Sequence, residues 1–370
     1  MGFEIENGVL TNYKKENGVT EVVIPSGVTS IDDYAFARCE SLKSIKLPDS
    51  VTSIGNNAFD SCGSLTSINI PDGVTSIGES AFSDCGSLTS INIPDSVTSI
   101  GDSAFSGCES LTSINIPNGI TSISDSIFDM CESLTNINIP DGVTSIGNNA
   151  FGGCESLTSI NIPDSVTSIG YNAFEGCVNL TNINIPDGVT SIESETFSSC
   201  ESLKSIDLPD GITIIDHGAF GGCISLTSIN IPDGVTSIGN LAFVGCKSLI
   251  SINIPDGVTS IGDRAFEGCE SLTSINILDS VTSIGNNAFG GCDSLPDEIK
   301  EQINKYIMKK EFILLNTYDG VEVIGEYDTL KEVFAQMKKI EKETDGECNL
   351  EYFSKKIEVD RKILKRLELI

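Results

Sequence analysis

The chain has 370 residues, with 53 acidic side chains against 22 basic ones and a formal net charge of −31. So negative a chain repels phosphate backbones and anionic lipid headgroups, which argues against a nucleic-acid or membrane-surface partner. No stretch approaches the roughly 18 apolar residues that a membrane-spanning helix requires, so we expect no membrane insertion. The first residues lack the basic start and apolar run of a secretory signal, and by default we expect a cytoplasmic protein.

Residues 1–18 are predicted to form an N-terminal cap. Phe3 and Ile5 precede Asn7-Gly8, and two further apolar residues follow it. Asn-Gly between short apolar runs is a strong signal for a β-hairpin.

A repeat occupies residues 19–295. Twelve of the thirteen cysteines, from Cys39 to Cys292, are spaced 23 residues apart, and a phenylalanine precedes each of them by three positions. Chains with such a fixed period form stacked repeat arrays, because one short unit cannot bury its apolar side chains alone. We therefore predict twelve stacked units of 23 residues.

Within one unit, for example residues 65–87, the apolar spacing changes twice. Ile68 and Ile70 alternate with polar residues, which predicts a strand. Pro71 ends the strand, and a turn leads to a second extended or turning segment. Residues 81–85, Ala-Phe-Ser-Asp-Cys, are then predicted to form one short helical turn.

The repeated pattern Leu-x-x-Ile-x-Ile-Pro-x-x-Val-x-x-Ile-x-x-x-Ala-Phe-x-x-Cys resembles the BspA-like leucine-rich repeat family. The resemblance implies an α/β repeat solenoid: a leucine-rich-repeat horseshoe of twelve 23-residue units with a parallel concave sheet and the bulkier turn on the opposite side. For many relatives it also implies a location at the cell surface and binding to proteins of a host or a neighbouring cell. It implies no catalytic residues.

The composition changes after the repeats. Residues 296–310 are predicted to form a helical cap or linker, with isoleucines at four-residue spacing. Residues 311–370 read as a small α+β domain in the order β-β-α-β, with two strands around Asp319-Gly320 and a helix that Thr329 and Glu332 cap. We recognise no family in this segment.

The cysteine column could hold free thiols, disulfides or a metal. Equivalent Cα atoms in adjacent strands lie about 4.8 Å apart, within the range that a disulfide tolerates. Side chains stacked in parallel do not readily adopt the torsion of that bond, and the close cysteine pairs typical of metal sites are absent from the sequence. We favour buried free thiols and expect no bound metal and no cofactor.

The sequence offers no catalytic constellation, so we do not predict an enzyme. His217 is the only histidine and occupies a variable surface position. The serines stand at repeat positions beside no evident base, and no phosphate-binding glycine loop is present.

A polar ladder on the strand is the candidate ligand-binding surface. Serine and asparagine alternate with the buried isoleucines and are predicted to form a concave, uncharged, hydrogen-bonding face. Charged residues interrupt this ladder near the N-terminus and in one later unit, where selectivity for a ligand is expected. The candidate residues are Lys43, Lys46, Ser67, Asn69, Ser90, Asn92, Ser113, Asn115, Ser159, Asn161, Lys204 and Asp207.

A second ladder is acidic and follows the prolines. Its carboxylates are expected to accept hydrogen bonds from backbone amides of their own turns, although calcium shared between neighbouring carboxylates is an alternative. The residues are Asp49, Asp72, Asp95, Asp141, Asp164, Asp187, Asp210, Asp233, Asp256 and Asp279.

Two functions fit these features. The first is a monomeric, non-enzymatic, adhesion-like scaffold that binds a protein or glycan ligand on the repeat face. The second is a structural spacer that presents the C-terminal domain.

Overall fold

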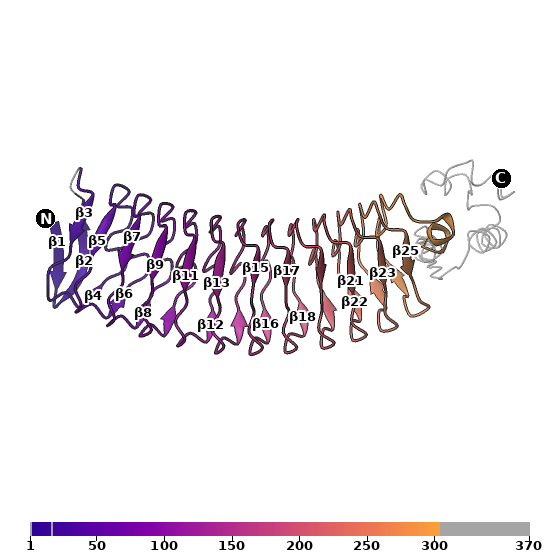
Figure 1. Ribbon diagram of the computed structural model, residues 1–370, viewed down its shortest axis with the longest axis horizontal. Coiled ribbons are helices and arrows are strands. Elements are labelled where there is room, and N and C mark those ends of the chain that lie inside the picture. Colours follow the sequence, from indigo (N-terminus) through magenta and orange to yellow (C-terminus); the bar gives the residue numbers. More distant parts are fainter. Residues whose placement is uncertain (1, 16–17, 304–370) are drawn as a thin grey trace, which may run out of the picture. The chain divides into compact units, whose positions relative to one another are not determined.

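The computed structural model describes residues 2–15 and 18–303. The chain divides into two compact units, Met1–Pro296 and Asp297–Ile370. In the first unit each repeat forms one coil with two short strands, and successive coils stack side by side (Figure 1). Of the second unit only residues 297–303 are described, and they are helical. The rest of the predicted helix and the predicted α+β domain lie outside the described residues.

The first unit opens with the hairpin that Asn7-Gly8 predicts. Strands β1 (Gly2–Glu6) and β2 (Val9–Lys14) pair antiparallel. Asn7 and Gly8 both have positive φ, 52° and 84°, as a tight hairpin turn requires. Strand β2 then pairs in parallel with the first coil, so this hairpin extends the strand row of the repeats at its N-terminal end.

The predicted strand of each repeat forms one row of parallel strands, which we call the Ser-Asn row. Its isoleucines point inward and its serines and asparagines point outward. Among the described residues the row comprises β3 (Glu21–Val23), β5 (Ser44–Lys46), β7 (Ser67–Asn69), β9 (Ser90–Asn92), β11 (Ser113–Asn115), β13 (Asn136–Asn138), β15 (Ser159–Ile160), β17 (Asn182–Ile183), β19 (Ser205–Ile206), β21 (Ser228–Asn230), β23 (Ser251–Asn253) and β25 (Ser274–Asn276).

The second extended segment of each repeat forms another row of parallel strands, which we call the Ser-Ile row. Within the described part of the chain it comprises β4 (Ser30–Ile31), β6 (Ser53–Ile54), β8 (Ser76–Ile77), β10 (Ser99–Ile100), β12 (Ser122–Ile123), β14 (Ser145–Ile146), β16 (Ser168–Ile169), β18 (Ser191–Ile192), β20 (Ile214–Ile215), β22 (Ser237–Ile238), β24 (Ser260–Ile261) and β26 (Ser283–Ile284).

The predicted helical turn is wrong. The described backbone of residues 2–15 and 18–296 contains no helix, and the Ala-Phe segment of each coil consists of consecutive tight turns. In one coil Asn57 and Ser61 have φ of 53° and 55°, and these left-handed residues prevent a right-handed helix from continuing. The repeats therefore form a β-solenoid rather than an α/β solenoid.

The phenylalanines form a continuous column inside the coils. From Tyr13 through Phe36 to Phe289, successive ring centroids lie 5.1–5.8 Å apart with interplanar angles of 2–27°. The rings from Phe36 to Phe266 are fully buried. Each ring therefore packs against the coil before it and the coil after it, and no coil has a core of its own.

The twelve repeat cysteines are buried free thiols, and Cys348 lies outside the described residues. Each thiol from Cys62 onward donates its S–H to the carbonyl oxygen of the phenylalanine 26 residues earlier, for example Cys177 to Phe151 at 3.2 Å. Burial raises the pKa of Cys177 and Cys223 to about 12, which keeps these thiols protonated as donors.

The two edges of the stack are held differently. The Ala-Phe turns are joined by three backbone hydrogen bonds per coil, such as those from the amides of Asn57, Phe59 and Ser61 to the next coil, each 2.8 Å. The Pro-Asp turn is closed within its own coil, from Val74 N to Pro71 O at 3.0 Å. Among the described residues, no backbone hydrogen bond joins neighbouring Pro-Asp turns.

This difference corrects the predicted curvature. In Figure 1 the stack bows toward the Ala-Phe turns, at the upper edge of the view, while the Pro-Asp turns spread apart along the lower edge. Side-chain bonds such as that from Ser96 Oγ to Val74 O at 2.6 Å join some of the Pro-Asp turns. The regular backbone bonds that keep the Ala-Phe turns close are missing there in the described part of the chain, and the coils separate more at this edge. The Ser-Asn row therefore lies on a flank of the stack rather than forming its concave surface, and the bulkier turn lies on the inner edge.

A glycine column allows close approach of the coils in the Ser-Ile row. A Cβ added at Gly101 would lie 2.4 Å from Glu79 N, and the other glycines of this column show similar approaches to backbone. The amide of Gly101 bonds Ile77 O at 2.9 Å. Where Ser124 replaces glycine, the hydroxyl instead donates to Ile100 O at 2.6 Å.

Two breaks in the Ser-Ile row coincide with such replacements. The described sheet pairing ends between β10 and β12 and again between β16 and β18, at the coils that carry Ser124 and Glu193. At these two coils a side chain in place of glycine accompanies the loss of strand pairing, whereas Asp32 at the same position keeps its amide bond to Leu10 O at 2.9 Å and its strand pairing. Asp216 at the same position likewise keeps its amide bond to Ile192 O at 2.9 Å, and nothing in the structure explains these two exceptions.

We predict that Phe151→Ala costs about 3–5 kcal/mol, because it empties a fully buried ring position. Each coil depends on its neighbours, so hydrogen exchange should rise first in the coils that carry Phe128 and Phe174. Exchange that rises equally at both ends of the solenoid would contradict this prediction.

We also predict that Gly101→Ala destabilises the fold by about 1–3 kcal/mol, because the new methyl group must push the preceding coil away. Gly63→Ala is the matched control, since an added Cβ there has no atom within 4 Å. Urea denaturation of both variants tests this expectation. Equal midpoints would show that the coils can accept a methyl group at Gly101 without loss of stability.

Stability should fall as the pH rises from 9 to 12. Burial raises the pKa of the Cys177 thiol to about 12 in the folded chain, whereas in the unfolded chain the thiol has its ordinary pKa of 9.0. Below pH 9 both states are protonated and this contribution is complete. Above pH 9 each such thiol should lower the free energy of unfolding by about 1.4 kcal/mol per pH unit.

Urea midpoints of the reduced protein at several pH values between 7.5 and 11 measure this effect. Cys177→Ala removes one such thiol, so the free energy of unfolding of this variant should fall by about 1.4 kcal/mol less per pH unit above pH 9 than that of the unmodified chain. An unchanged slope would mean that this thiol is not protected in the folded chain.

Candidate functional site

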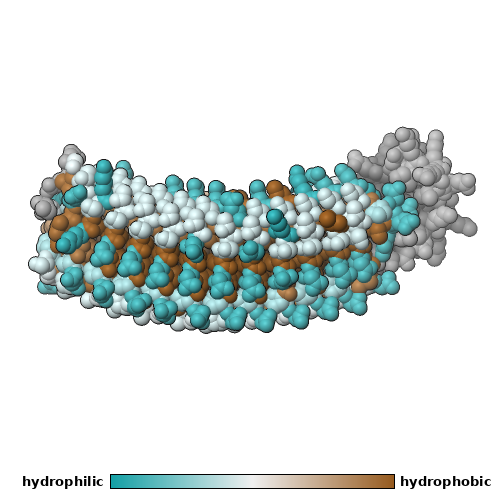
Figure 2. Space-filling view, in the orientation of Figure 1, coloured by the Kyte–Doolittle hydropathy of each residue, from teal (hydrophilic) through white to brown (hydrophobic). Residues whose placement is uncertain are grey.

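The structure places ten of the twelve candidate residues in the serine and asparagine columns of the Ser-Asn row and places Lys43 and Lys204 one residue before that row, and every one of the twelve is exposed. Their register is regular: Ser67 pairs with Ser90, and Asn69 with Asn92. Lys46 precedes Asn69 in the asparagine column, and Asp207 continues that column from Asn184. Ten candidates therefore line two straight columns along one flank of the stack, and the remaining two stand in the column next to the serines; Figure 2 shows hydrophilic side chains recurring along a flank at regular spacing.

The serines and asparagines of these columns point to solvent. Their strands bury the intervening isoleucines, for example Ile68 at 5% exposed and Ile70 at 2%. In residues 2–15 and 18–303, no side-chain hydrogen bond involves the eight candidate serines and asparagines. Their donors and acceptors are therefore available to a ligand.

A threonine column borders these residues and fixes the edge of the face. The Thr66 hydroxyl donates to Lys43 O at 3.1 Å, and the Thr89 hydroxyl donates to Thr66 O at 3.3 Å. Each hydroxyl thus repeats the bond that the backbone amide of the same residue makes to the preceding coil. Lys43 and Lys204 stand in this column and cannot donate in the same way.

The N-terminal end of the face combines charge with apolar surface. Lys46 pairs in register with Val23, which is 59% exposed. Lys43 lies three residues before Lys46 on the same coil and is also exposed. The sequence predicted the two lysines as sites of selectivity, and the structure adds the exposed valine beside them.

Sequence reasoning missed two exposed isoleucines farther along this flank. Ile250 replaces threonine in the threonine column and is 52% exposed, and Ile224 follows Cys223 and is 39% exposed. Ile250 keeps the regular backbone bonds to both neighbouring coils, and the Ile224 carbonyl keeps its bond to the next coil while its amide bonds Gly222 O within its own coil. The signal that could have identified both is an isoleucine at a position where most other coils carry threonine, in the case of Ile250, or a charged residue, in the case of Ile224.

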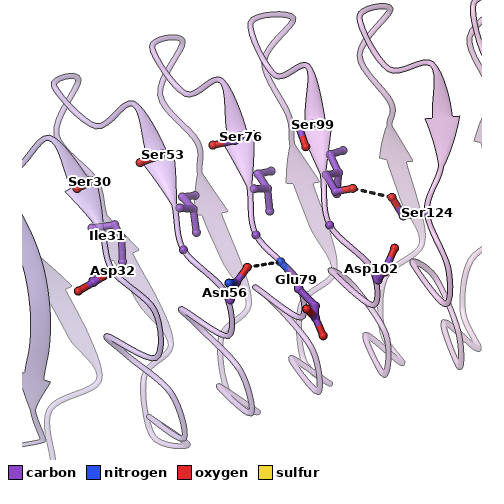
Figure 3. A pocket seen from close by; sticks show the side chains of 16 residues that line it. Ser30, Ile31, Asp32, Ser53, Asn56, Ser76, Glu79, Ser99, Asp102 and Ser124 are labelled. Carbon is purple, nitrogen blue, oxygen red and sulfur yellow. Dashed lines mark hydrogen bonds between the residues drawn. The ribbon is translucent and has the colours of Figure 1, made fainter.

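A shallow groove of about 590 Å³ follows the Ser-Ile row, and sequence reasoning missed it as well (Figure 3). The serine hydroxyls of β4 to β10 line one side. The other side carries acidic and amide side chains, including Asp32, Glu79 and Asp102. A second groove of about 540 Å³ continues it from Asp102 to Glu193.

The groove exists because its floor is the glycine column. The flanking asparagines and aspartates are partly committed to the fold, since Asn56 Oδ1 accepts the amide of Glu79 at 2.9 Å (Figure 3). The next groove uses the same device, with Asp125 Oδ1 accepting the Asn148 amide at 2.8 Å. Neither groove is lined by lysine or arginine, so chemically they could accept hydroxyl or cationic groups.

The acidic ladder does not form the predicted bonds within its turns. In the described part of the chain, no hydrogen bond involves the carboxylates of this ladder, and Asp72 lies exposed beside a turn that the backbone closes. Among these residues, no three His, Cys, Asp or Glu side chains come together as a metal site.

His217 is more engaged than its exposed position suggested. Its Nε2 lies 3.6 Å from a carboxylate oxygen of Glu195 on the preceding coil, and both side chains are about two fifths exposed.

Among the described residues, no helix is long and apolar enough to cross a membrane.

Similar proteins share this architecture. A leucine-rich cell surface protein of Faecalibacterium prausnitzii A2-165 is 37% identical, with 78% of this chain and 89% of that chain covered and a TM-score of 0.58. A leucine-rich repeat protein of Bacteroides ovatus ATCC 8483 is 33% identical, with 79% and 90% covered and a TM-score of 0.60. No curated protein matches the chain.

The family resemblance of the repeats is also confirmed. The pattern of the BspA type leucine rich repeat region matches residues 11–135, 121–250 and 213–341, which together exceed half of the chain. Given this match and the coils described above, the chain belongs to the BspA-type leucine-rich repeat family.

Proposed function

We propose that the protein is a non-enzymatic binding scaffold of the cell surface that engages a protein or glycan ligand through the Ser-Asn row. The observation that carries this proposal is the straight array of exposed serine and asparagine side chains, of which the eight candidate residues make no side-chain hydrogen bond within the described part of the chain. Such an array offers donors and acceptors at a regular spacing, which suits an extended ligand surface.

Rigidity of the frame supports this proposal. The strands that carry Ser90 and Asn92 pair with neighbours on both sides, and their isoleucines are buried. A preorganised surface loses little conformational freedom when it binds, so more of the contact energy remains as affinity. Adhesion through many weak polar contacts is consistent with such a face.

The proposed location rests on the relatives. The Faecalibacterium prausnitzii protein, 37% identical over most of its length, is described as a cell surface protein. We carry this location over to the present chain in place of the cytoplasmic default. The glycan or protein nature of the ligand is left to the experiment below.

The test measures binding of the fluorescently labelled full chain to intact epithelial and bacterial cells. Asn115→Arg places a bulky charge in the centre of the Ser-Asn row and should weaken binding about tenfold or more. Asn118→Arg is the matched control, because Asn118 lies on the same coil and is exposed in the Pro-Asn turn outside this row. Loss of binding after protease treatment of the cells indicates a protein ligand, and loss after periodate indicates a glycan.

Equal binding of both variants and the unmodified chain would contradict the proposal. The spacer hypothesis predicts a different result. If the solenoid only presents the C-terminal domain, a chain in which an unrelated rigid rod of equal length replaces the solenoid should bind the cells as well as the unmodified chain. No catalytic activity is proposed for the repeats.

A further inference from the structure

We propose that Lys204, Ile224, Lys247 and Ile250 form a recognition patch for a protein ligand that presents an apolar side chain beside a carboxylate. This inference rests on the proposed function and specifies the chemistry of its partner. It concerns one region of the flank that carries the Ser-Asn row.

Ile250 does not serve the fold in the way its column does. At equivalent positions Thr227 donates its hydroxyl to Lys204 O at 3.1 Å, and Thr273 donates to Ile250 O at 3.1 Å. Ile250 keeps only its backbone bond to Thr227 O, also 3.1 Å, and leaves 52% of its surface in water. The replacement loses a hydrogen bond and exposes apolar surface, so neither change stabilises the isolated chain.

Ile224 shows the same departure in the neighbouring column. Most coils carry a charged residue at this position, such as Glu201, Lys247 and Glu270. Val178 is apolar there but only partly exposed, whereas Ile224 is apolar and 39% exposed. The amide of Ser248 bonds Ile224 O at 3.2 Å, which places Lys247 on the adjacent coil beside it. Positions that break a local rule without a structural gain are typical of functional surfaces.

The four residues lie close enough to form one contact. Lys204 and Ile250 stand two coils apart in the threonine column, which is about 10 Å at the usual strand spacing. Ile224 and Lys247 occupy adjacent coils, each three residues before the threonine-column position of its own coil. The four residues therefore present two apolar side chains beside two cations, which an apolar side chain and a carboxylate of one ligand could contact together.

Charge indicates the kind of partner. Between residues 47 and 263 the sequence contains no lysine or arginine except Lys204 and Lys247. Lys247 contacts Glu270 at 3.4 Å, but both side chains are more than half exposed, so this pair is weak and replaceable. The surrounding acidic chain repels a carboxylate, and this patch is where one could approach.

The repeat itself supplies the test variants. Lys204→Thr, Ile224→Glu and Ile250→Thr together restore the residues that other coils carry at these positions, so this reverted variant should fold. Ile214→Ser is the matched control: Ile214 is 45% exposed, lies in strand β20 of the other row and stands where other coils carry serine. The probe is a phage-displayed library of random peptides, selected on the full chain.

The selected peptides should be enriched in acidic residues next to apolar ones. They should bind the full chain and the Ile214→Ser variant equally, and bind the reverted variant about tenfold more weakly or worse. The thermal midpoint of the reverted variant should equal or exceed that of the unmodified chain, because the lost hydroxyl bond returns.

Three results would overturn the patch. They are an absence of selected peptides, equal binding to the reverted variant, and a reverted variant with a lower midpoint, which would assign the isoleucines to folding. If peptide binding is lost in Asn115→Arg but kept in the reverted variant, the Ser-Asn row stands as a binding surface and only the patch fails.

Discussion

The stacking of each coil on the next is the constraint on which the rest of this structure depends. One coil of 23 residues has no interior, and its phenylalanine ring becomes buried only between the rings of its neighbours, 5.1–5.8 Å away. The thiol column works in the same way, since each S–H reaches a phenylalanine carbonyl of the preceding coil. Stability and rigidity are therefore properties of the array rather than of any single repeat.

The same stacking explains where the array is regular and where it is interrupted. Backbone bonds hold the Ala-Phe turns together, whereas the Pro-Asp turns lack such bonds among the described residues, and the stack bows accordingly. Glycine permits close approach in the Ser-Ile row, and Ser124 and Glu193 stand where the sheet pairing breaks. Strand pairing can thus be lost at a coil without disturbing the phenylalanine column, whose rings remain stacked from Phe105 to Phe128.

A frame of this kind separates folding from recognition. The inward columns scarcely vary, because any change there affects two neighbours at once. The outward columns tolerate lysine, aspartate and even isoleucine, since those side chains meet mainly water. Departures in the outward columns, as at Lys204 and Ile250, are therefore informative about binding. A departure in an inward column has to be accommodated by the fold. Thr196 stands where most coils carry alanine, and its hydroxyl lies 2.8 Å from Glu193 O and 3.4 Å from Gly170 O of the preceding coil, which satisfy it.

The sequence by itself determined the repeat length, the inward and outward positions of the first strand, the Asn7-Gly8 hairpin and the family, because period and alternation depend only on local side-chain direction. Only the tertiary structure decided the replacement of the helical turn by left-handed turn residues, the direction of the bow, the groove over the glycine column and the exposure of Ile224 and Ile250. These features depend on how closely one coil approaches the next, and that distance is set by contacts between residues 22 to 26 positions apart, which no local pattern contains.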